Sequence, residues 1–352
     1  MTLVAREPLR TPSTWLGPEL MTNDDWIRRL TAEQIAEQIA DLENALEIAK
    51  GSGKPMTELT REDFPLPILA PAIAEWMESL QNGRGFINVK GIPVDGRDEN
   101  DIGLIHWGLG LHMGTAVSQN AAGDLLGHVR DTGADPDDTS VRLYKTRVDL
   151  GFHSDGSDLV ALLCIRQGQS GGENQLVSTA ALYNEILRRR ADLVPLLYES
   201  FYWDRNDEQA LGEDPFFRLP ICHYLEGKLT FFYIPWYIRK AQRHSQVPRF
   251  TPEQTELLDL IDEIAEDPAF HVEMRLEPGE INYLKNNAVL HARTEYKDFD
   301  EPERKRHLVR LWLTAHDEWA DGDAFVQQGI PVKKGVVSDA DDIARADETS
   351  TG

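Results

Sequence analysis

The fold class is decided by three neighbouring stretches in the middle of the chain, VRLYKTRVDLGFHSD (residues 141–155), DLVALLCIR (158–166) and NQLVST (174–179). They are rich in β-branched, aromatic and other apolar residues, and Gly, Ser and Asp lie between them, which predicts strands separated by turns. A Pro-Gly turn leads into another predicted strand at LEPGEINYL (276–284), and HLVRLWLTAH (307–316) predicts the last one.

Helices are predicted as insertions between these strands. The tetrapeptides TAEQ at Thr31 and TPEQ at Thr251 both match the capping box that starts a helix. Further helical stretches are predicted at 71–80 and 178–199. Because no βαβ rhythm is present, the pattern indicates a mainly β protein with inserted helices, arranged as a β-sandwich or jelly roll. The polar stretch 117–140 predicts a long loop, either a functional lid or a disordered segment.

The composition excludes several classes of protein. Of 352 residues, 41% are hydrophobic and 27% are charged, as in an ordinary globular protein. The formal charge of −24 repels phosphate backbones and anionic lipids, so neither nucleic acid nor a membrane surface is expected as a partner. The first residues, MTLVAREPLR, lack the apolar core of a signal peptide, which predicts a cytoplasmic location. Two cysteines, Cys164 and Cys222, are too few for a disulfide framework.

One short motif could hold a metal ion. In the segment GFHSDGSD, His153 and Asp155 are two residues apart, so on a strand both side chains point to the same face. An imidazole and a carboxylate, with one more histidine, are the ligands of an iron(II) site that keeps open positions. This HxD pattern is common by chance, and the second half of the signal lies far along the chain. His291 ends the strand-like segment AVLH, and Arg306 and Arg310 follow it.

Taken together, HSD, the GG-E-N turn at 171–174, the distal His291 and the pair Arg306 and Arg310 resemble the TauD/TfdA family. These are iron(II)- and 2-oxoglutarate-dependent dioxygenases of the taurine dioxygenase and clavaminate synthase-like type. The resemblance covers residues 85–318 and implies a double-stranded β-helix, a variant of the jelly roll. The activity it implies is oxidation of an unactivated C–H bond of a small molecule with dioxygen, releasing succinate and carbon dioxide. A homo-oligomer is compatible with this sequence.

Carried over by position, the resemblance implies that His153, Asp155 and His291 bind iron(II). Arg306 would hold the far carboxylate of 2-oxoglutarate, and Arg310 would contact the cosubstrate or the substrate. Where taurine dioxygenase-like members have a Thr that also holds the cosubstrate, this chain has Asn174. An amide can still donate a hydrogen bond there.

Local charge suggests a class of substrate. Arg142, Lys145 and Arg147 lie close to Tyr144 just before the HSD motif, in a chain that is otherwise acidic. They are either anchors for a carboxylate-bearing substrate or surface cations on a solvated strand. Asp149 could bind an amine, which together with Arg147 would fit an amino acid.

The resemblance also divides the chain into segments. Residues 1–84 are expected to form an N-terminal arm and helices that pack on the core. Residues 85–335 would form the TauD/TfdA-like catalytic domain with lid-like loops. The acidic, aromatic-free segment 336–352 is expected to be disordered. Three alternatives stay open: a metal-dependent isomerase or hydrolase of cupin type that does not use 2-oxoglutarate, a non-catalytic family member, and a hydroxylase of protein side chains.

Overall fold

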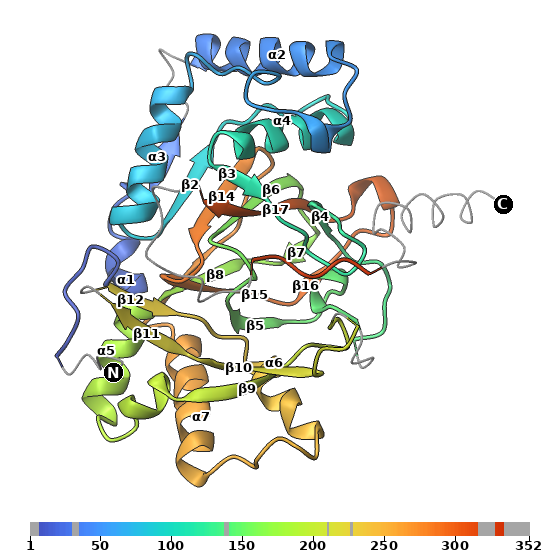
Figure 1. Ribbon diagram of the computed structural model, residues 1–352. Helices are drawn as coiled ribbons and strands as arrows, with labels where there is room; N and C mark the ends of the chain where they lie inside the picture. Colours follow the sequence, from blue (N-terminus) through green and yellow to red (C-terminus); the bar gives the residue numbers. More distant parts are fainter. Residues whose placement is uncertain are drawn as a thin grey trace.

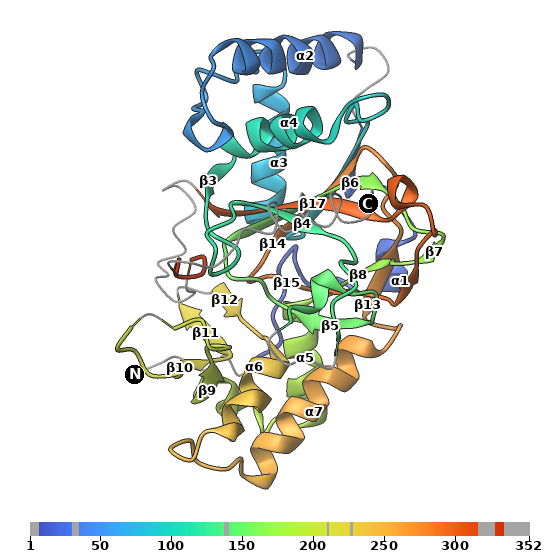
Figure 2. The ribbon, with the colours of Figure 1, turned by 90° about the vertical axis from the view of Figure 1, so that its right-hand side faces the viewer.

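The structure is a computed structural model, and it describes residues 7–29, 35–136, 141–209, 211–225, 228–315 and 328–333. Two antiparallel-rich sheets face each other at its centre (Figures 1 and 2). The larger sheet has the order β1-β2-β14-β6-β17-β3, with β4 also paired to β17. Its strands are β1 Ile27–Arg29, β2 Phe86–Lys90, β3 Gly114–Ala116, β4 Leu126–Val129, β6 Leu159–Arg166, β14 Glu280–Lys285 and β17 His307–Ala315.

The smaller sheet has the order β13-β8-β15-β5. Its strands are β5 Leu150–His153, β8 Asn174–Ser178, β13 His271–Met274 and β15 Val289–Arg293. Three short pairs lie beside the two sheets. They are β7 Ser170–Gly171 with β16 Tyr296–Lys297, β9 Ser200–Asp204 with β10 Phe216–Pro220, and β11 Cys222–Leu225 with β12 Lys228–Phe231. The two facing sheets confirm the predicted jelly-roll architecture.

Helices cover the outer face of each sheet (Figure 2). The helices of the described residues are α1 Gly17–Leu20, α2 Ile35–Gly51, α3 Ala70–Asn82, α4 Glu99–Leu111, α5 Thr179–Arg189, α6 Pro235–Lys240 and α7 Pro252–Glu266. Of these, α1 contributes to the core between the sheets and α6 lines the cavity described below. Helices α2, α3 and α4 pack on the larger sheet in one hydrophobic core, while α5 and α7 pack on the smaller sheet in another. A third core fills the space between the sheets.

Strand β6 shows why this arrangement forms. Its apolar residues alternate between two cores: Leu159, Ala161 and Leu163 face the helices, while Val160 and Leu162 face the other sheet. A strand that is covered on both faces needs a continuous apolar run, and DLVALLCIR supplies one. The same alternation on β17 turns Val309, Leu311 and Leu313 outward and brings Arg310 and Trp312 to the inner face.

Several sequence expectations need correction. The segment predicted as a strand from residue 141 begins with a 3-10 helix, Leu143–Lys145, and only Leu150–His153 is extended. The loop predicted at 117–140 contains strand β4, which pairs with β17. The helix predicted over 178–199 ends at Arg189 and is followed by a 3-10 helix, Val194–Tyr198.

The capping box predicted at Thr251 is confirmed, because its hydroxyl accepts from the amide of Gln254 and the Gln254 side chain bonds back. The box at Thr31 and the predicted tail 336–352 lie outside the described residues. Among the residues that the structure describes, no helix is long and apolar enough to cross a membrane. The boundary expected between residues 84 and 85 stays a prediction, although α2 and β17 share one core. The cytoplasmic location also stays a prediction.

Candidate metal centre

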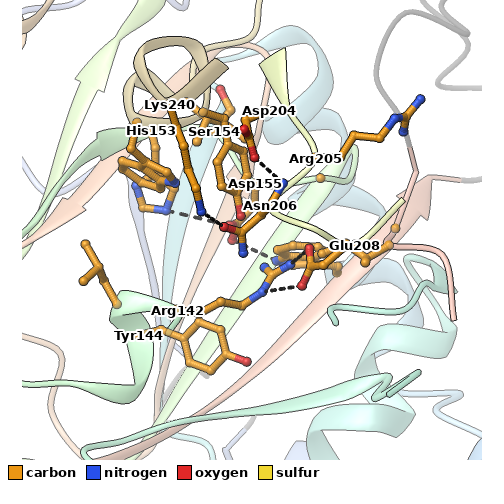
Figure 3. Close-up of a pocket in the computed structure, with 18 of the residues that line it drawn as sticks. Arg142, Tyr144, His153, Ser154, Asp155, Asp204, Arg205, Asn206, Glu208 and Lys240 are labelled. Carbon is orange, nitrogen blue, oxygen red and sulfur yellow. Dashed lines mark hydrogen bonds and ion pairs between the residues drawn. The ribbon is translucent and has the colours of Figure 1, made fainter. Parts of the chain in front are cut away.

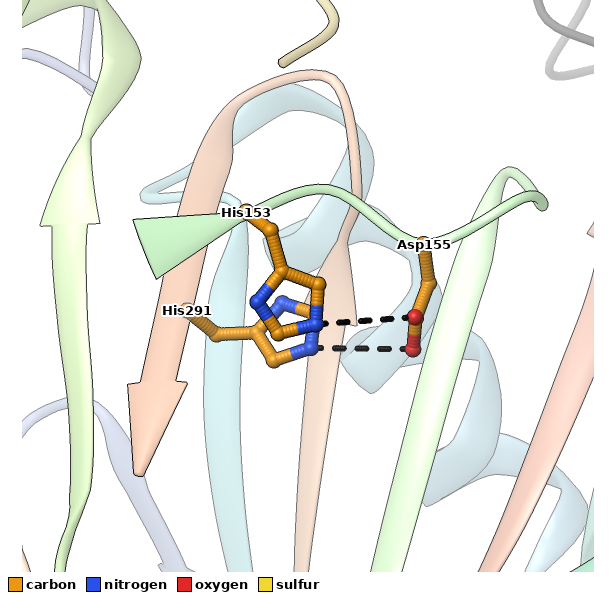
Figure 4. Close-up of side chains that lie close together, drawn as sticks. All are labelled: His153, Asp155 and His291. Atoms are coloured by element: carbon orange, nitrogen blue, oxygen red, sulfur yellow. Dashed lines mark ion pairs between the residues drawn. The ribbon is translucent and has the colours of Figure 1, made fainter. Parts of the chain in front are cut away.

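Three side chains of different origin meet at the inner face of the smaller sheet (Figure 4). His153 closes β5, Asp155 follows in the next turn, and His291 lies in the middle of β15. The register pairs His291 directly with His153, so strand pairing brings the distant histidine to the HxD motif. One ligand atom from each residue lies within 4.8 Å of the others. The Nε2 atoms of His153 and His291 are 3.7 and 3.6 Å from the carboxylate oxygens of Asp155.

Hydrogen bonds orient these groups toward a common point. The Nδ1 atom of His153 lies 2.8 Å from the carbonyl oxygen of Gly151. A carbonyl only accepts, so Nδ1 carries the proton and Nε2 is left free as a ligand. Trp312 donates from Nε1 to Asp155 at 2.8 Å, and Arg310 donates from Nη1 at 3.1 Å. The carboxylate is therefore held by two donors from β17, on the opposite sheet.

The backbone of the ligand turn is fixed as well. The side-chain oxygen of Asn286 accepts from the amide of Asp155 at 2.8 Å, and its NH2 donates to the carbonyl of Ser157 at 2.7 Å. Ser154 donates its amide to the carbonyl of Tyr233 at 2.7 Å. A ligand turn bonded on both sides keeps the carboxylate in one position, as a metal site requires.

Electrostatics keep His153 and Asp155 in their ligand forms. Burial, helped by the nearby His291, lowers the pKa of His153 to about 3, so its imidazole is neutral at physiological pH. Burial alone would raise the pKa of Asp155, but Arg310 and the two histidines lower this pKa well below its usual range. Neutral imidazoles and an ionised carboxylate are the forms that bind a metal ion. Two histidines and one carboxylate fit iron(II) with open positions.

A cavity of about 600 Å³ leads away from this cluster (Figure 3). Its inner end is formed by His153, Asp155, Arg310 and Trp312. Its walls are mostly apolar, as is usual for a small-molecule site. These wall residues are Val141, Leu143, Tyr144, Leu150, Phe217, Leu219, Phe232, Ile234, Trp236, Tyr237, Ile330 and Pro331.

The part of the lining contributed by the β9–β10 segment and α6 is charged. Arg142 donates to Glu208 in a two-pronged ion pair, with distances of 2.5 and 3.2 Å. Lys240, from the end of α6, donates to the side chain of Asn206 at 2.5 Å. Arg205 also lines this region. The charged lining here consists of the cations Arg142, Arg205 and Lys240 and the acids Asp204 and Glu208. Arg205 is paired with Glu213, which lies outside the lining, at 3.8 Å.

Asp204 is the other acid in this region, and it is already neutralised. It is fully buried, and it accepts from Arg243 at 2.7 Å and from His244 at 2.8 Å. The chain then turns sharply, because Asn206 and Asp207 have positive φ angles of 52° and 60°. Asn and Asp tolerate this conformation better than other residues with a side chain, although it still costs backbone energy. This turn places the Asn206 amide beside Lys240.

The residues expected to hold 2-oxoglutarate lie elsewhere. Arg306, just before β17, is 1% exposed, and its Nη2 donates to the carbonyl of Gly172 at 3.4 Å. Gly172 has a φ angle of +75°, and a Cβ atom there would lie 2.8 Å from Nε of Arg306. The double glycine of the GG-E-N turn therefore lets the backbone approach the guanidinium closely. Asn174 begins β8 and is also buried.

The proposed substrate anchors are not brought together. Tyr144 and Arg310 line the cavity, whereas Lys145, Arg147 and Asp149 are absent from its lining. The Arg147 side chain is 58% exposed and pairs with Asp131 at 3.0 Å. The geometry therefore moves the candidate anchor along the chain to Arg142, because the 3-10 helix after it rotates the following cations away from the cavity.

Sequence reasoning missed several partners of the site. Trp312 and Gln119 hold Asp155 and Arg310, and Glu208 and Lys240 form the charged part of the lining. Glu208 and Lys240 lie in segments without a recognisable motif, so no local signal identifies them. Trp312 is different: it lies two residues after Arg310 on the same strand and therefore shares its face.

Comparisons with known proteins agree with this geometry. The model of the family described as "Taurine catabolism dioxygenase TauD, TfdA family" matches residues 52–312. FR-33289 synthase of Streptomyces rubellomurinus is 31% identical over 324 residues, covering 90% of this chain and 93% of the relative. The taurine hydroxylase-like protein SAT17 of Stachybotrys chartarum is 26% identical, covering 86% of this chain and 79% of the relative.

Solved structures share the fold at lower identity. Asparagine oxygenase in complex with Fe(II), 3-hydroxyasparagine and succinate superimposes with a TM-score of 0.59 at 17% identity, covering 82% of this chain and 94% of the other. The non-heme iron oxygenase OrfP in complex with Fe and alpha-ketoglutaric acid gives a TM-score of 0.60 at 14% identity, covering 87% of this chain and 100% of the other. This level of likeness supports the jelly-roll fold.

Proposed function

The chain belongs to the taurine catabolism dioxygenase TauD, TfdA family, and on this basis we propose that it oxidises a C–H bond of a small anionic molecule. The enzyme is a 2-oxoglutarate-dependent dioxygenase, with iron(II) as its metal and with 2-oxoglutarate and dioxygen as cosubstrates. The proposal concerns the substrate and the residues that hold each component.

One observation carries the proposal: the buried cluster of His153, Asp155 and His291 lies at the end of a cavity of about 600 Å³ whose lining is charged in one region. A cavity of this size suits a small molecule, because ligand pockets usually measure ~300–1,000 Å³. Bound by these three residues, iron(II) would couple the oxidative decarboxylation of 2-oxoglutarate to the oxidation of the substrate.

The surrounding residues prepare the site for this chemistry. Trp312 and Arg310 donate to Asp155 and fix the carboxylate, and the bond from His153 to Gly151 fixes the imidazole. Three protein ligands leave room for the 2-oxo acid and dioxygen. The apolar walls exclude water, which protects a reactive intermediate from side reactions.

Arg306 is our candidate for binding the far carboxylate of 2-oxoglutarate. Its side chain is buried, and two of its nitrogens, Nε and Nη1, have no hydrogen-bond partner among the described residues. A buried guanidinium with unused donors is costly unless an anion binds it. Its fork of N–H groups matches a carboxylate.

The charged part of the lining supports an anionic substrate. With Asp204 paired to Arg243 and Arg205 paired to Glu213, the remaining cations Arg142 and Lys240 outnumber Glu208 there, although the whole chain carries a charge of −24. We infer that an acidic group of the substrate is bound by Arg142 and Lys240. Oxidation at one carbon requires a fixed pose, and a polar anchor away from that carbon provides it.

The test is an anaerobic titration of the metal-free protein with iron(II) and then with 2-oxoglutarate. Chelation of the metal by the 2-oxo acid produces a weak visible absorption band, which reports formation of the complex without turnover. A substrate screen then measures succinate release with amino acids, other carboxylic acids, sulfonates, neutral aromatic or terpenoid compounds, and a set of peptides.

The outcomes separate the alternatives. No band, with metal bound, would indicate a cupin-type isomerase or hydrolase that does not use 2-oxoglutarate. A band together with stimulation by neutral compounds alone would contradict the anionic substrate. Stimulation by a peptide but by none of the small molecules would identify a hydroxylase of protein side chains.

A further inference from the structure

A second arginine shares the features that single out Arg306. Arg293 closes β15, its residue is 4% exposed, and its Nε and Nη1 have no hydrogen-bond partner among the described residues. Its Nη2 donates to the carbonyl of Val148. In each arginine, therefore, one guanidinium nitrogen donates to a backbone carbonyl and the other two have no hydrogen-bond partner among the described residues. Two such groups in one protein interior are a large uncompensated cost unless a ligand completes them.

The two guanidinium groups converge from opposite sheets. Arg293 comes from the smaller sheet and Arg306 from the chain entering the larger one. Both lie against the ring of Tyr296, with guanidinium carbons 4.9 and 5.0 Å from its centre. Aromatic faces attract cations, so the ring can hold both side chains in place. The ring face accepts hydrogen bonds only weakly, and the buried hydroxyl of Tyr296 has no hydrogen-bond partner among the described residues.

The buried pair of guanidinium groups has no carboxylate of its own among the described residues. The acids nearest in electrostatic terms are Asp149 and Asp131, and Asp131 is paired with Arg147. Asp298 lies near Arg306, but its Oδ1 accepts from the Arg306 backbone amide at 2.6 Å, and its Oδ2 has no hydrogen-bond partner among the described residues. In the described part of the chain, no carboxylate is ion-paired with either guanidinium.

The position of Arg293 relates it to the metal cluster. It follows His291 by two residues on β15, so both side chains belong to the same face of the strand, about 6.6 Å apart along it. Asn174 lies directly opposite Arg293 on β8. The Nδ2 atom of Asn174 is also buried without a partner among the described residues. The unbonded donors of Arg293, Arg306 and Asn174 therefore lie in one region, which begins two residues beyond the ligand His291 along β15.

We propose that Arg293 binds the far carboxylate of 2-oxoglutarate together with Arg306, so that two arginines share this anion. The inference rests on the proposed function, because it takes 2-oxoglutarate as the ligand. Each carboxylate oxygen can then accept charge-assisted hydrogen bonds from a different guanidinium. The neutral amide of Asn174 completes the set as a third donor.

This arrangement makes a prediction about cosubstrate selection. The two cations act only on the far carboxylate, so they discriminate between 2-oxoglutarate and 2-oxopentanoate, which has the same five carbons but no far carboxylate. A residue that merely supports the fold would affect the binding of both acids equally. The comparison of the two acids therefore distinguishes a binding role from a structural one.

The experiment uses the full chain, loaded with iron(II) under anaerobic conditions. The dissociation constant of each 2-oxo acid is measured by calorimetry and by the visible absorption of the complex. We compare the unmodified protein with Arg293→Met, Arg293→Lys, Arg306→Met and the control Arg304→Met. Arg304 is a surface residue, with its side chain 52% exposed and paired with Glu301. Iron content and thermal unfolding are measured for every variant.

For Arg293→Met we expect binding of 2-oxoglutarate to weaken about 10- to 100-fold, the loss expected for a charge-assisted hydrogen bond. Binding of 2-oxopentanoate should stay within about twofold, since its contacts lie elsewhere. Arg293→Lys should lose part of the discrimination, because an ammonium keeps the charge but not the fork. Arg304→Met should change neither constant.

Each failure has a separate meaning. Equal weakening of both acids in Arg293→Lys and in any folded Arg293→Met protein overturns the inference, and so does full retention of the discrimination. If Arg306→Met loses the discrimination while both Arg293 variants keep it, Arg306 acts alone and the proposed function stands. If the unmodified protein binds iron but not 2-oxoglutarate, the proposed function itself fails.

Discussion

At the inner end of the cavity the functional groups come from strands and the turn after β5, whereas in its charged part they come from the residue before a 3-10 helix, a turn and the end of a short helix. His153, Asp155 and His291 are buried and are held by partners in both sheets. Arg142 and Glu208 are held mainly by each other, with side chains 15% and 19% exposed.

The difference indicates that metal binding and substrate selection depend on different parts of the site. Strand pairing positions groups accurately, so the inner end suits chemistry that does not vary. Turns change more readily without loss of the fold, so the charged part suits selection of a substrate. Asn206, with its positive φ angle, is part of this second region. Changes at the inner end should therefore affect metal binding, and changes in the charged part should affect substrate affinity.

The largest effect is expected at the inner end. His291→Ala removes one of three ligands, and we expect iron(II) binding and turnover to be lost while the protein stays folded. Iron content after anaerobic loading and circular dichroism would measure this. The matched control is His112→Gln, since His112 bonds to the carbonyl of Phe64 outside the cavity lining. Full iron occupancy in His291→Ala would remove this residue from the metal site.

The next effect belongs to the charged part. Arg142→Met should raise the KM of the accepted anionic substrate about 10- to 100-fold and leave iron content unchanged, because a charge-assisted contact is lost. Succinate release as a function of substrate concentration measures it. Arg147→Met is the control, because Arg147 is exposed and does not line the cavity. A larger effect of the Arg147 change would return the anchor to the cation favoured by the sequence.

A smaller effect is expected at Trp312, which does not bind the metal itself but donates a hydrogen bond to the ligand Asp155. Trp312→Phe keeps an aromatic ring but loses the N–H group that bonds to Asp155 at 2.8 Å. We expect iron(II) affinity to fall about tenfold, at the lower end of losses seen when a ligand loses its supporting bond. Competition with a chelator measures the affinity. Trp107→Phe controls for the change of ring, since the buried Nε1 of Trp107 has no partner among the described residues.

The smallest effect tests whether water is excluded from the region where α4 packs on the larger sheet. Burial lowers the pKa of His106, on α4, to about 4 from the ordinary value of 6.5 for a histidine. The unfolded chain then takes up a proton between these two values and the folded protein does not. The free energy of unfolding should therefore decrease as the pH falls from 6.5 toward 4.

For His106 alone this loss should reach about 1 kcal/mol between pH 7 and pH 5.5. Urea unfolding of the unmodified protein and of His106→Gln at both pH values isolates it, because other titrating groups contribute equally to both proteins. Identical pH dependence of the two proteins would mean that His106 titrates normally and that water reaches this core.

Much of the metal centre could be predicted from the sequence, because two of its ligands are close together in the chain. The spacing of His153 and Asp155 makes them neighbours on one face, and the resemblance to a known family then pointed to His291 and Arg306. Arg293 could have been found in the same way, because it follows His291 by two residues. The substrate anchors could not, because residues 143–145 form a 3-10 helix that changes which side chains face inward.

The amino-acid sequence by itself determined the elements: the continuous apolar run that makes β6 a buried strand, the capping box that starts α7, and the HxD motif. These depend on side-chain periodicity and on bonds between residues a few positions apart. Only the tertiary structure decided the register that sets His291 beside His153 and the pairing of Arg142 with Glu208. Such contacts depend on how distant strands and turns pack, because many registers satisfy the same local pattern and the packed core selects one.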